Sequence, residues 1–169
     1  MGEIWFVSDL HFGHNNVISY CQRPFTSVEE MDQTLVDNWN KTVAGNDKVY
    51  CLGDMAFHNY ERISELNGIK FLIPGNHDLE RSKKIFPHVQ EVCPELHYLK
   101  VSKEKRFVLC HYPIESWRRE YPMHLHGHSH GTSVKRHNRM DVGVDATRGY
   151  RPIHIDEAVQ QIWLNNLDL

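Results

Sequence analysis

Several features that mark common protein classes are absent from this sequence. No apolar stretch approaches the roughly 20 residues of a membrane-spanning helix, and the N-terminus lacks the basic and apolar segments of a secretory signal. The formal net charge of −3 provides no broad basic face for tight nucleic-acid binding. We therefore expect a cytoplasmic protein without a membrane segment and without an extended nucleic-acid surface.

Cysteine is scarce, and its spacing argues against two kinds of site. The cysteines at positions 21, 51, 93 and 110 form no Cys-x-x-Cys motif, and two of them lie inside apolar runs. Neither a disulfide framework nor a zinc knuckle fits that spacing. We predict that these cysteines are reduced core residues.

What the sequence does contain is an alternation of strand-like and helix-like segments along one domain, residues 1–169. The first half predicts strands at 3–8, 48–52 and 69–73 and helices at 28–43 and 60–67. Ser27, with Glu30 three positions later, is a helix-capping signal, and Gly68 is suited to end the second helix. Strands that alternate with helices favour a parallel sheet with crossover helices.

The second half is richer in strands. It predicts a hairpin over 96–101 and 106–110, strands near 123–126 and 140–145, and a closing helix over 157–166 with Asp156 as its cap. The expected fold class is α/β with mixed α+β character, in which two mixed sheets pack face to face and helices lie outside them.

Four short polar islands and one separate histidine lie at or near the ends of predicted strands. They are Asp9-Leu10-His11, Gly53-Asp54, Gly75-Asn76-His77-Asp78, Gly127-His128-Ser129-His130 and the single His111. Side chains at strand ends across one sheet can converge on a single point. Carboxylate, imidazole and amide groups in these proportions suit a pair of divalent ions bound by nitrogen and oxygen, without a thiolate.

Each island also has an ordinary explanation when it is taken alone. Asp9 can cap a loop while His11 lies on the surface, and both Gly-Asp and Gly-Asn-His-Asp are common in turns. The combination favours metal binding. Asp9 and His11, two positions apart at a strand end, are expected to point to the same side, and Asp54 can bridge two ions about 3.5–4 Å apart.

In this order, the islands resemble the scattered pattern of the calcineurin-like metallophosphoesterase superfamily. That pattern is Asp-x-His, Gly-Asp, Gly-Asn-His-Asp or Gly-Asn-His-Glu, a lone His and Gly-His-x-His, and here it spans residues 9–130. The resemblance implies a four-layer sandwich, in which two mixed β-sheets lie between helices and the dimetal site lies at strand ends. It also implies a metal-dependent phosphoric ester hydrolase.

Six residues of the islands and the separate His111 match metal-binding positions of the superfamily. One ion would be held by Asp9, His11 and His130, the other by Asn76, His111 and His128, and both by the bridging Asp54. By the same resemblance, His77 donates a proton to the leaving oxygen and Asp78 orients it. The implied mechanism is attack by a metal-bridging hydroxide with His77 as general acid. Mn²⁺ is the expected ion, and Fe²⁺, Ni²⁺, Co²⁺ and Zn²⁺ are the other candidates.

Two departures narrow the subfamily. Protein phosphatases of the superfamily place an arginine just after Gly-Asp and have Glu at the end of the third block, whereas this chain has Met55 and Asp78. Its length resembles that of the small stand-alone bacterial and phage members, which are often phosphodiesterases or broad phosphatases. We expect a small phosphoester substrate, with nucleotides and cyclic nucleotides among the candidates and with diesters preferred.

Residues outside the metal set must select the substrate, and several lie close to ligand blocks. The candidates are Trp117, Arg118 and Arg119 between two blocks, His14 and His58 beside blocks, and, more weakly, Arg148 and Arg151. Trp117 and the two arginines beside it can stack on a base and hold a phosphate, or they can pack on the domain and face solvent. The alternative to an enzyme is a non-catalytic metal-binding scaffold or protein-interaction module on the same fold. Because His77 and every metal position are filled, the sequence favours the enzyme.

Overall fold

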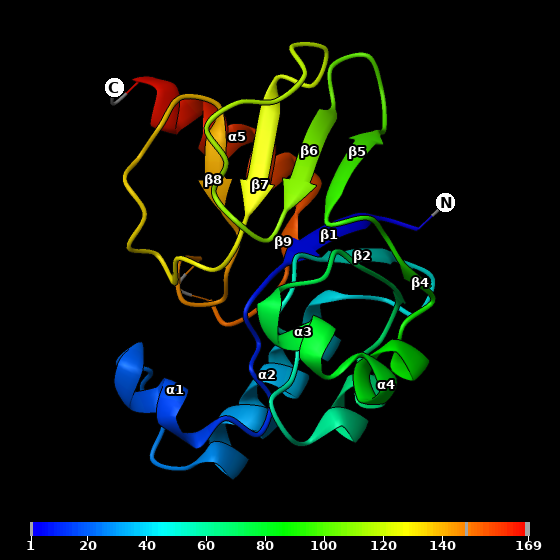
Figure 1. Ribbon diagram of the computed structural model, residues 1–169, viewed down its shortest axis with the longest axis vertical. Coiled ribbons are helices and arrows are strands. Elements are labelled where there is room, and N and C mark those ends of the chain that lie inside the picture. The colour runs from blue at the N-terminus through cyan, green and yellow to red at the C-terminus, as the bar shows by residue number, and fades with distance from the viewer. Residues whose placement is uncertain (1, 148, 168–169) are drawn as a thin grey trace.

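The computed structural model describes residues 2–147 and 149–167, and its first sheet has the strand order β4-β3-β2-β1-β9 (Figure 1). The strands are β1 (Ile4–Val7), β2 (Lys48–Cys51), β3 (Ile69–Leu72), β4 (Glu91–Val92) and β9 (Ile153–His154). The first four strands are parallel to one another, and β9 is antiparallel to β1. The alternation of strands and helices therefore produces the parallel arrangement that the sequence predicts.

The second sheet has the order β5-β6-β7-β8. Its strands are β5 (Leu96–Lys100), β6 (Arg106–Cys110), β7 (Met123–His126) and β8 (Arg139–Asp141). β5 and β6 form the predicted antiparallel hairpin, whereas β6, β7 and β8 are parallel. Both sheets are mixed, as predicted.

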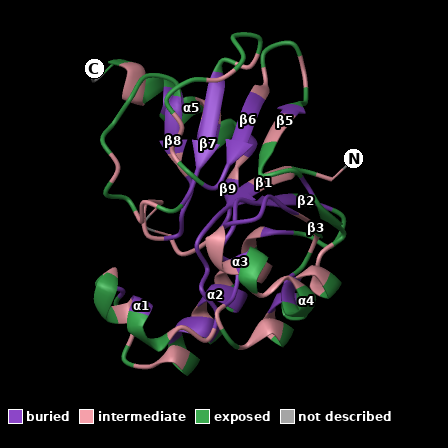
Figure 2. Cartoon of the chain, in the orientation of Figure 1, coloured by how far each residue is buried: buried purple, intermediate pink, exposed green. Residues whose placement is uncertain are grey.

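Two layers of apolar side chains hold the sheets and helices together, and Figure 2 shows buried residues concentrated on the strands. Between the sheets, Phe6 of β1 packs on Phe107 of β6, with ring centroids 5.4 Å apart, and α5 (Ile155–Leu167) buries Ile162 in the same cluster. On the other side of the first sheet, Leu35 and Trp39 of α2 (Val28–Thr42) pack in a second cluster. The predicted arrangement of two sheets with flanking helices is confirmed.

Several helical elements differ from the sequence prediction. The helix expected over 60–67 is a 3₁₀ segment, η1 (Tyr60–Glu65), although Gly68 beyond it does have a left-handed φ of +86°. α5 begins at Ile155, so Asp156 lies in its first turn instead of capping it. The cap of α2 is as predicted, because Ser27 Oγ accepts a hydrogen bond from the N–H of Glu30 at 3.2 Å.

Four further helical elements escaped the sequence analysis because each is too short to show a helical period. They are α1 (Asn15–Tyr20), α3 (Asn76–Glu80), α4 (Ser82–Ile85) and the 3₁₀ segment η2 (Phe86–His88). The two-residue strands β4 and β9 were missed for the same reason.

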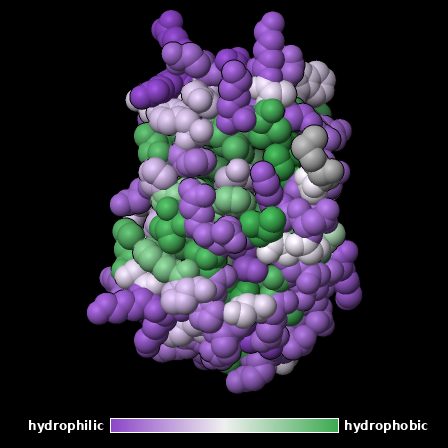
Figure 3. Space-filling model, turned by 90° about the vertical axis from the view of Figure 1, so that its right-hand side faces the viewer, coloured by the Kyte–Doolittle hydropathy of each residue, from purple (hydrophilic) through white to green (hydrophobic). Residues whose placement is uncertain are grey.

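The helices, the cysteines and the surface can be compared with the features that the sequence predicts. None of the described helices is long and apolar enough to cross a lipid bilayer. All four cysteines are free; three are buried, and Cys21 is half-buried. Seen from the side of β4 and β5, the molecule shows hydrophobic surface around its middle and hydrophilic surface at both ends (Figure 3).

The two sheets meet directly before the first polar island. Ser8 forms a parallel bridge to Gly143, with Ser8 N–H donating to Val142 O at 3.2 Å and Val144 N–H donating to Ser8 O at 3.1 Å. The carboxyl ends of β1, β2 and β3 therefore lie beside those of β6 and β7, and the loops that follow these strands can share one site.

Candidate metal centre

The loops that carry the polar islands have an unusual backbone. Five of the seven predicted ligand residues have φ between 47° and 65°, in the left-handed region, and they are Asp9, His11, Asp54, His128 and His130. For residues other than glycine this conformation costs on the order of 1–3 kcal/mol each and is concentrated at functional sites. We predicted that Asp9 and His11 share a side because they alternate along a strand. That reason is wrong, since β1 ends at Val7 and the left-handed backbone turns both side chains inward.

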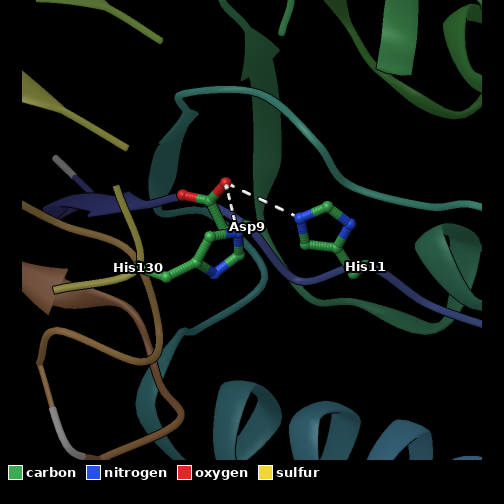
Figure 4. A group of neighbouring side chains, drawn as sticks. All are labelled: Asp9, His11 and His130. Carbon is green, nitrogen blue, oxygen red and sulfur yellow. Dashed lines mark ion pairs between the residues drawn. The ribbon is translucent and has the colours of Figure 1, made fainter. Parts of the chain in front are cut away.

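Asp9 is at the centre of the first group of potential ligands. Its Oδ2 accepts a hydrogen bond from the N–H of His128 at 2.9 Å. Its Oδ1 faces Nε2 of His11 at 3.7 Å and Nε2 of His130 at 3.9 Å (Figure 4). These separations are too long for hydrogen bonds but close to the roughly 3.4 Å between two ligands of one tetrahedral ion.

The carboxylate of Asp54 joins this group to a second one. Its Oδ2 lies 3.7 Å from Nε2 of His11, 3.5 Å from Nε2 of His111 and 4.0 Å from Nε2 of His77. Asp9, Asp54 and His111 also form a cluster of potential ligand atoms within 4.8 Å of one another. One oxygen of Asp54 therefore faces imidazoles from both predicted ligand sets, as a bridging carboxylate would.

His111 and His128 form the second group. The Nδ1 atom of His111 lies 2.7 Å from Leu52 O, which directs its Nε2 to the site, and Nε2 is 3.2 Å from Nδ1 of His128. Asn76, the first residue of α3, is connected to this pair through Tyr112, whose hydroxyl donates to Asn76 Oδ1 at 3.5 Å and whose ring contacts both imidazoles. Tyr112 was not among the predicted site residues.

Two orphaned atoms test whether metal ions fit this site. Asp9 Oδ1 and His11 Nε2 are buried without a hydrogen-bond partner in the part of the chain that the structure describes. A buried polar atom without a partner costs about 1–3 kcal/mol, and a cation between these two atoms would remove that cost for both. The donors around it are carboxylate oxygens and imidazole nitrogens, which suit divalent transition metals. The residues fit a metal centre.

The protonation of two imidazoles, those of His11 and His128, favours metal binding. Burial lowers the pKa of His11 and of His128, which keeps both rings neutral, the form that binds metal. Burial acts to raise the pKa of Asp9, but neighbouring histidines, chiefly His11, outweigh it and hold that pKa well below its usual range. For His130, burial lowers the pKa, but the hydrogen bond to Asp145 outweighs it and raises the pKa to about 10. An ion that binds His130 must therefore displace a proton.

Arg23 and Asp145 support the first group, and the sequence analysis missed both. Asp145 Oδ2 lies 2.7 Å from Nδ1 of His130, which leaves Nε2 of that ring directed toward Asp9. Arg23 forms two hydrogen bonds of 2.8 Å to the Asp145 carboxylate and donates to Asp9 O at 2.7 Å. Cys21, His130 and Asp145 also form a cluster of potential ligand atoms, so a thiol lies beside a site that we predicted without one.

Replacing Asp145 tests this support. Asp145→Asn removes the carboxylate that holds the ring of His130, and we expect roughly 10- to 100-fold weaker affinity for the ion at that ring. Metal titration by calorimetry measures the change, and the exposed Asp37→Asn on α2, which bonds only the side chain of Gln33 among described contacts, is the matched control. Unchanged affinity in Asp145→Asn would show that this pair is structural only.

Asp78 has partners that differ from the prediction. We expected it to orient His77, but its carboxylate accepts hydrogen bonds from the backbone N–H groups of Asp54 at 2.6 Å, Gly75 at 2.9 Å and Met55 at 3.1 Å. Burial raises its pKa to about 6, opposed by these backbone hydrogen bonds. Asp78 therefore fixes the loop that carries Asp54.

His77 is held by other neighbours. Its backbone N–H donates to Asp54 Oδ1 at 3.1 Å, its ring contacts Phe57 edge-on at 5.5 Å, and Arg81 lies 3.5 Å from its Nδ1. About a third of its side chain is exposed. The ring thus lies between the Asp54 carboxylate and solvent, where a substrate can reach it.

Gly127 gives the ligand loops the space they need. A Cβ at this position would collide with Ser8 Oγ and Asp9 Oδ2, both buried. We expect Gly127→Ala to lower the free energy of unfolding by about 1–3 kcal/mol and to weaken metal binding. Chemical denaturation measures the first effect. The control is Gly45→Ala, where a Cβ would meet nothing within 4 Å, and equal stability of the two variants would contradict the expected collision.

Of the predicted substrate residues, some lie at the cleft beside the metal ligands and others do not. His14 lines the cleft beside the metal ligands, and burial lowers its pKa to about 4. His58 packs edge-on against Phe57, which also lines this cleft. Arg148 lies outside the described residues, and Arg151 pairs with Glu157 at 3.1 Å.

Trp117, Arg118 and Arg119 are not among the residues that line this cleft within the described chain. Trp117 packs on His124 and donates from Nε1 to Tyr121 O at 2.6 Å, and Arg118 lies over the ring of Tyr98 at 4.9 Å. These contacts agree with the alternative that this segment packs on the domain. Substrate binding by these three residues stays a prediction.

Comparison with known proteins decides the family. Residues 3–145 match the calcineurin-like phosphoesterase superfamily domain. The chain belongs to this superfamily. All seven predicted ligand positions lie within the matched region, and the two mixed sheets with a buried Asp–His cluster at their ends agree with the calcineurin-like phosphoesterase fold.

Similar proteins extend over nearly the whole chain. The uncharacterized protein MJ1445 of Methanocaldococcus jannaschii is 33% identical, over 96% of this chain and 92% of its own. Gene 66 protein of Mycobacterium phage D29 is 27% identical, over 96% of this chain and 98% of its own. The crystal structure of AQ665 from Aquifex aeolicus, a protein of unknown function, has a TM-score of 0.72 at 23% identity, covering 96% of this chain and all of that one, and it shows the same fold.

Proposed function

We propose that this calcineurin-like phosphoesterase hydrolyses phosphodiester bonds with two divalent ions, Mn²⁺ being the expected ion. The observation that supports it most strongly is the Asp54 carboxylate, whose Oδ2 faces His11, His111 and His77 within 4.0 Å. One ion would be held by Asp9, His11 and His130, the other by Asn76, His111 and His128, and both by Asp54. When bound, the two ions lower the pKa of a shared water and neutralise charge on the phosphoryl oxygens.

The side chains of the chain itself supply the remaining steps. His77, about a third exposed beside Asp54, protonates the leaving oxygen, and Phe57 and Arg81 keep its ring in place. Asp78 holds the Asp54 loop through three backbone N–H groups, so the bridging carboxylate is positioned before substrate arrives. Arg23 holds the carboxylate of Asp145, and that carboxylate holds the ring of His130 in place.

The charges of the cleft favour diesters over monoesters. The two arginines that line it, Arg136 and Arg139, both pair with Glu115, at 3.8 Å and 3.0 Å. Because a monoester carries a second negative charge near neutral pH, it would need a cation that is not already paired. We therefore expect a small phosphodiester substrate, with nucleotides as the leading candidates.

Metal-dependent hydrolysis tests this proposal. With added Mn²⁺, the protein should hydrolyse bis-p-nitrophenyl phosphate faster than p-nitrophenyl phosphate, and chelation should stop turnover until metal is restored. No turnover of either ester with Mn²⁺, Ni²⁺, Co²⁺, Fe²⁺ or Zn²⁺ would overturn the proposal and favour a binding scaffold instead.

A further inference from the structure

A cleft of about 960 Å³ is lined by three of the proposed metal ligands, His11, His128 and His130. Val17 and Tyr20 of α1 border it on one side, and Val134, in the loop that follows β7, belongs to another segment of its lining. Figure 1 shows α1 standing away from the body of the molecule, with the loops after β7 and β8 across the gap from it. The volume is large enough for a substituted phosphoester.

Two side chains of this cleft are unusually exposed. Tyr20 is 74% exposed and Val134 is 66% exposed, the highest values among the large hydrophobic residues that the structure describes. Single exposed hydrophobic residues are ordinary on protein surfaces, but these two lie on different segments of one cleft beside a chemical centre. Covering such surface yields about 25 cal/mol per Å² of apolar area. An apolar group of the substrate would therefore gain binding free energy by covering Tyr20 and Val134 in this cleft.

The rings around the cleft form a continuous row from the proposed acid to the rim. Phe57 lies 5.5 Å from His77, His14 lies 4.4 Å from Phe57, and Tyr20 lies 6.3 Å from His14, measured between ring centroids. Aromatic surfaces of this kind stack on planar groups, and a nucleobase on one aromatic side chain contributes about 1–3 kcal/mol.

The charged side chains of the cleft indicate which kind of aromatic phosphoester the cleft can bind. A phosphorylated tyrosine is also aromatic, but it is a monoester dianion, and both arginines of the cleft are already paired with Glu115. A nucleoside phosphodiester has a planar base and a single negative charge at the phosphate. It fits both the rings and the charges.

We propose that this cleft is a base-binding subsite for a nucleoside phosphoester, with the ring of Tyr20 as the stacking platform and Val134 as a second apolar contact. The subsite deepens the proposed phosphodiesterase function and rests on it. The phosphate lies at the metal ligands, and the base extends along α1.

Equilibrium binding to the metal-loaded protein tests the subsite. Thymidine 5′-methylphosphonate and ethyl methylphosphonate each carry a single negative charge, as a phosphodiester does, and only the first carries a base, so calorimetry should show thymidine 5′-methylphosphonate binding about 5- to 150-fold more tightly. Tyr20→Ala should remove most of that difference and leave the affinity for ethyl methylphosphonate unchanged. Tyr20→Phe should keep it, and so should Trp163→Ala, which removes a 60% exposed aromatic ring on α5 that does not line the cleft.

Equal affinity for the two ligands in the unmodified protein, or equal weakening of both by Tyr20→Ala, would overturn the subsite. Hydrolysis of ethyl p-nitrophenyl phosphate by the same metal-loaded preparation reports separately on the proposed function. Hydrolysis of this diester without a preference for the ligand that carries a base would reject the subsite alone. No hydrolysis of this diester would reject the proposed phosphodiesterase function.

Discussion

Asp54→Asn is expected to lower metal occupancy and reduce kcat/KM by roughly 10³-fold or more, because several kcal/mol of charge stabilisation depend on the two ions. The amide removes the negative charge that faces His11 and His111 at 3.7 Å and 3.5 Å. The backbone N–H of Asp54 would still bond Asp78, so the fold should persist. Metal content by mass spectrometry, turnover and circular dichroism measure the three effects.

The exposed Asp37→Asn is the matched control for Asp54→Asn, and we expect it to retain both ions and full turnover. Full activity in a metal-loaded Asp54→Asn variant would show that the bridging role belongs to another residue. Asp9 would then be the first alternative, because it lies in two clusters of potential ligand atoms, one with His11 and His130 and one with Asp54 and His111.

His77→Ala is expected to keep both ions and to lose rate in proportion to the basicity of the leaving group. Its Nε2 is 4.0 Å from Asp54 Oδ2 and its ring borders the cleft, so it can reach a leaving oxygen. General-acid catalysis contributes about 10²- to 10⁴-fold when the leaving group is a poor one, and much less when it is an activated phenol. The rates of an alkyl or ribose ester and of a nitrophenyl ester, measured with the same variant, test the difference.

His88→Ala, which removes a histidine bonded to Ser64 away from the cleft, is the control for His77→Ala and should be neutral on both esters. If His77→Ala slowed both esters equally, or lost metal, the general-acid assignment would be wrong.

The parts of the fold that could be predicted from sequence are those with enough residues to show a period. The apolar runs of β1, β2, β3 and β6 and the amphipathic α2 are long enough for their types to be evident. The six-residue α1 and the two-residue β9 are too short to show a period, and contacts with distant segments stabilise them more than their own sequence does. Missing α1 in the sequence matters for function, since α1 carries Tyr20 and borders the cleft.

The candidate site shows the same division between local pattern and distant contact. The structure brings together the side chains of the islands, such as Asp9, Asp54 and His111, because strand ends carry them to the seam between the sheets. The partners of Asp78 could not be predicted, since they depend on how two loops pack. Arg23 lacks any sequence signal. Asp145, however, is the last residue of the strand predicted near 140–145, so a carboxylate at a strand end was visible in the sequence there too.

Titration of the metal-free protein with Mn²⁺, followed by electron paramagnetic resonance, tests the two-ion centre most directly. We expect two ions per chain, an exchange-coupled spectrum because Asp54 bridges them, and hydrolysis of bis-p-nitrophenyl phosphate that rises with the second equivalent. Saturation at a single ion, or two ions with uncoupled spectra, would contradict a centre bridged by Asp54.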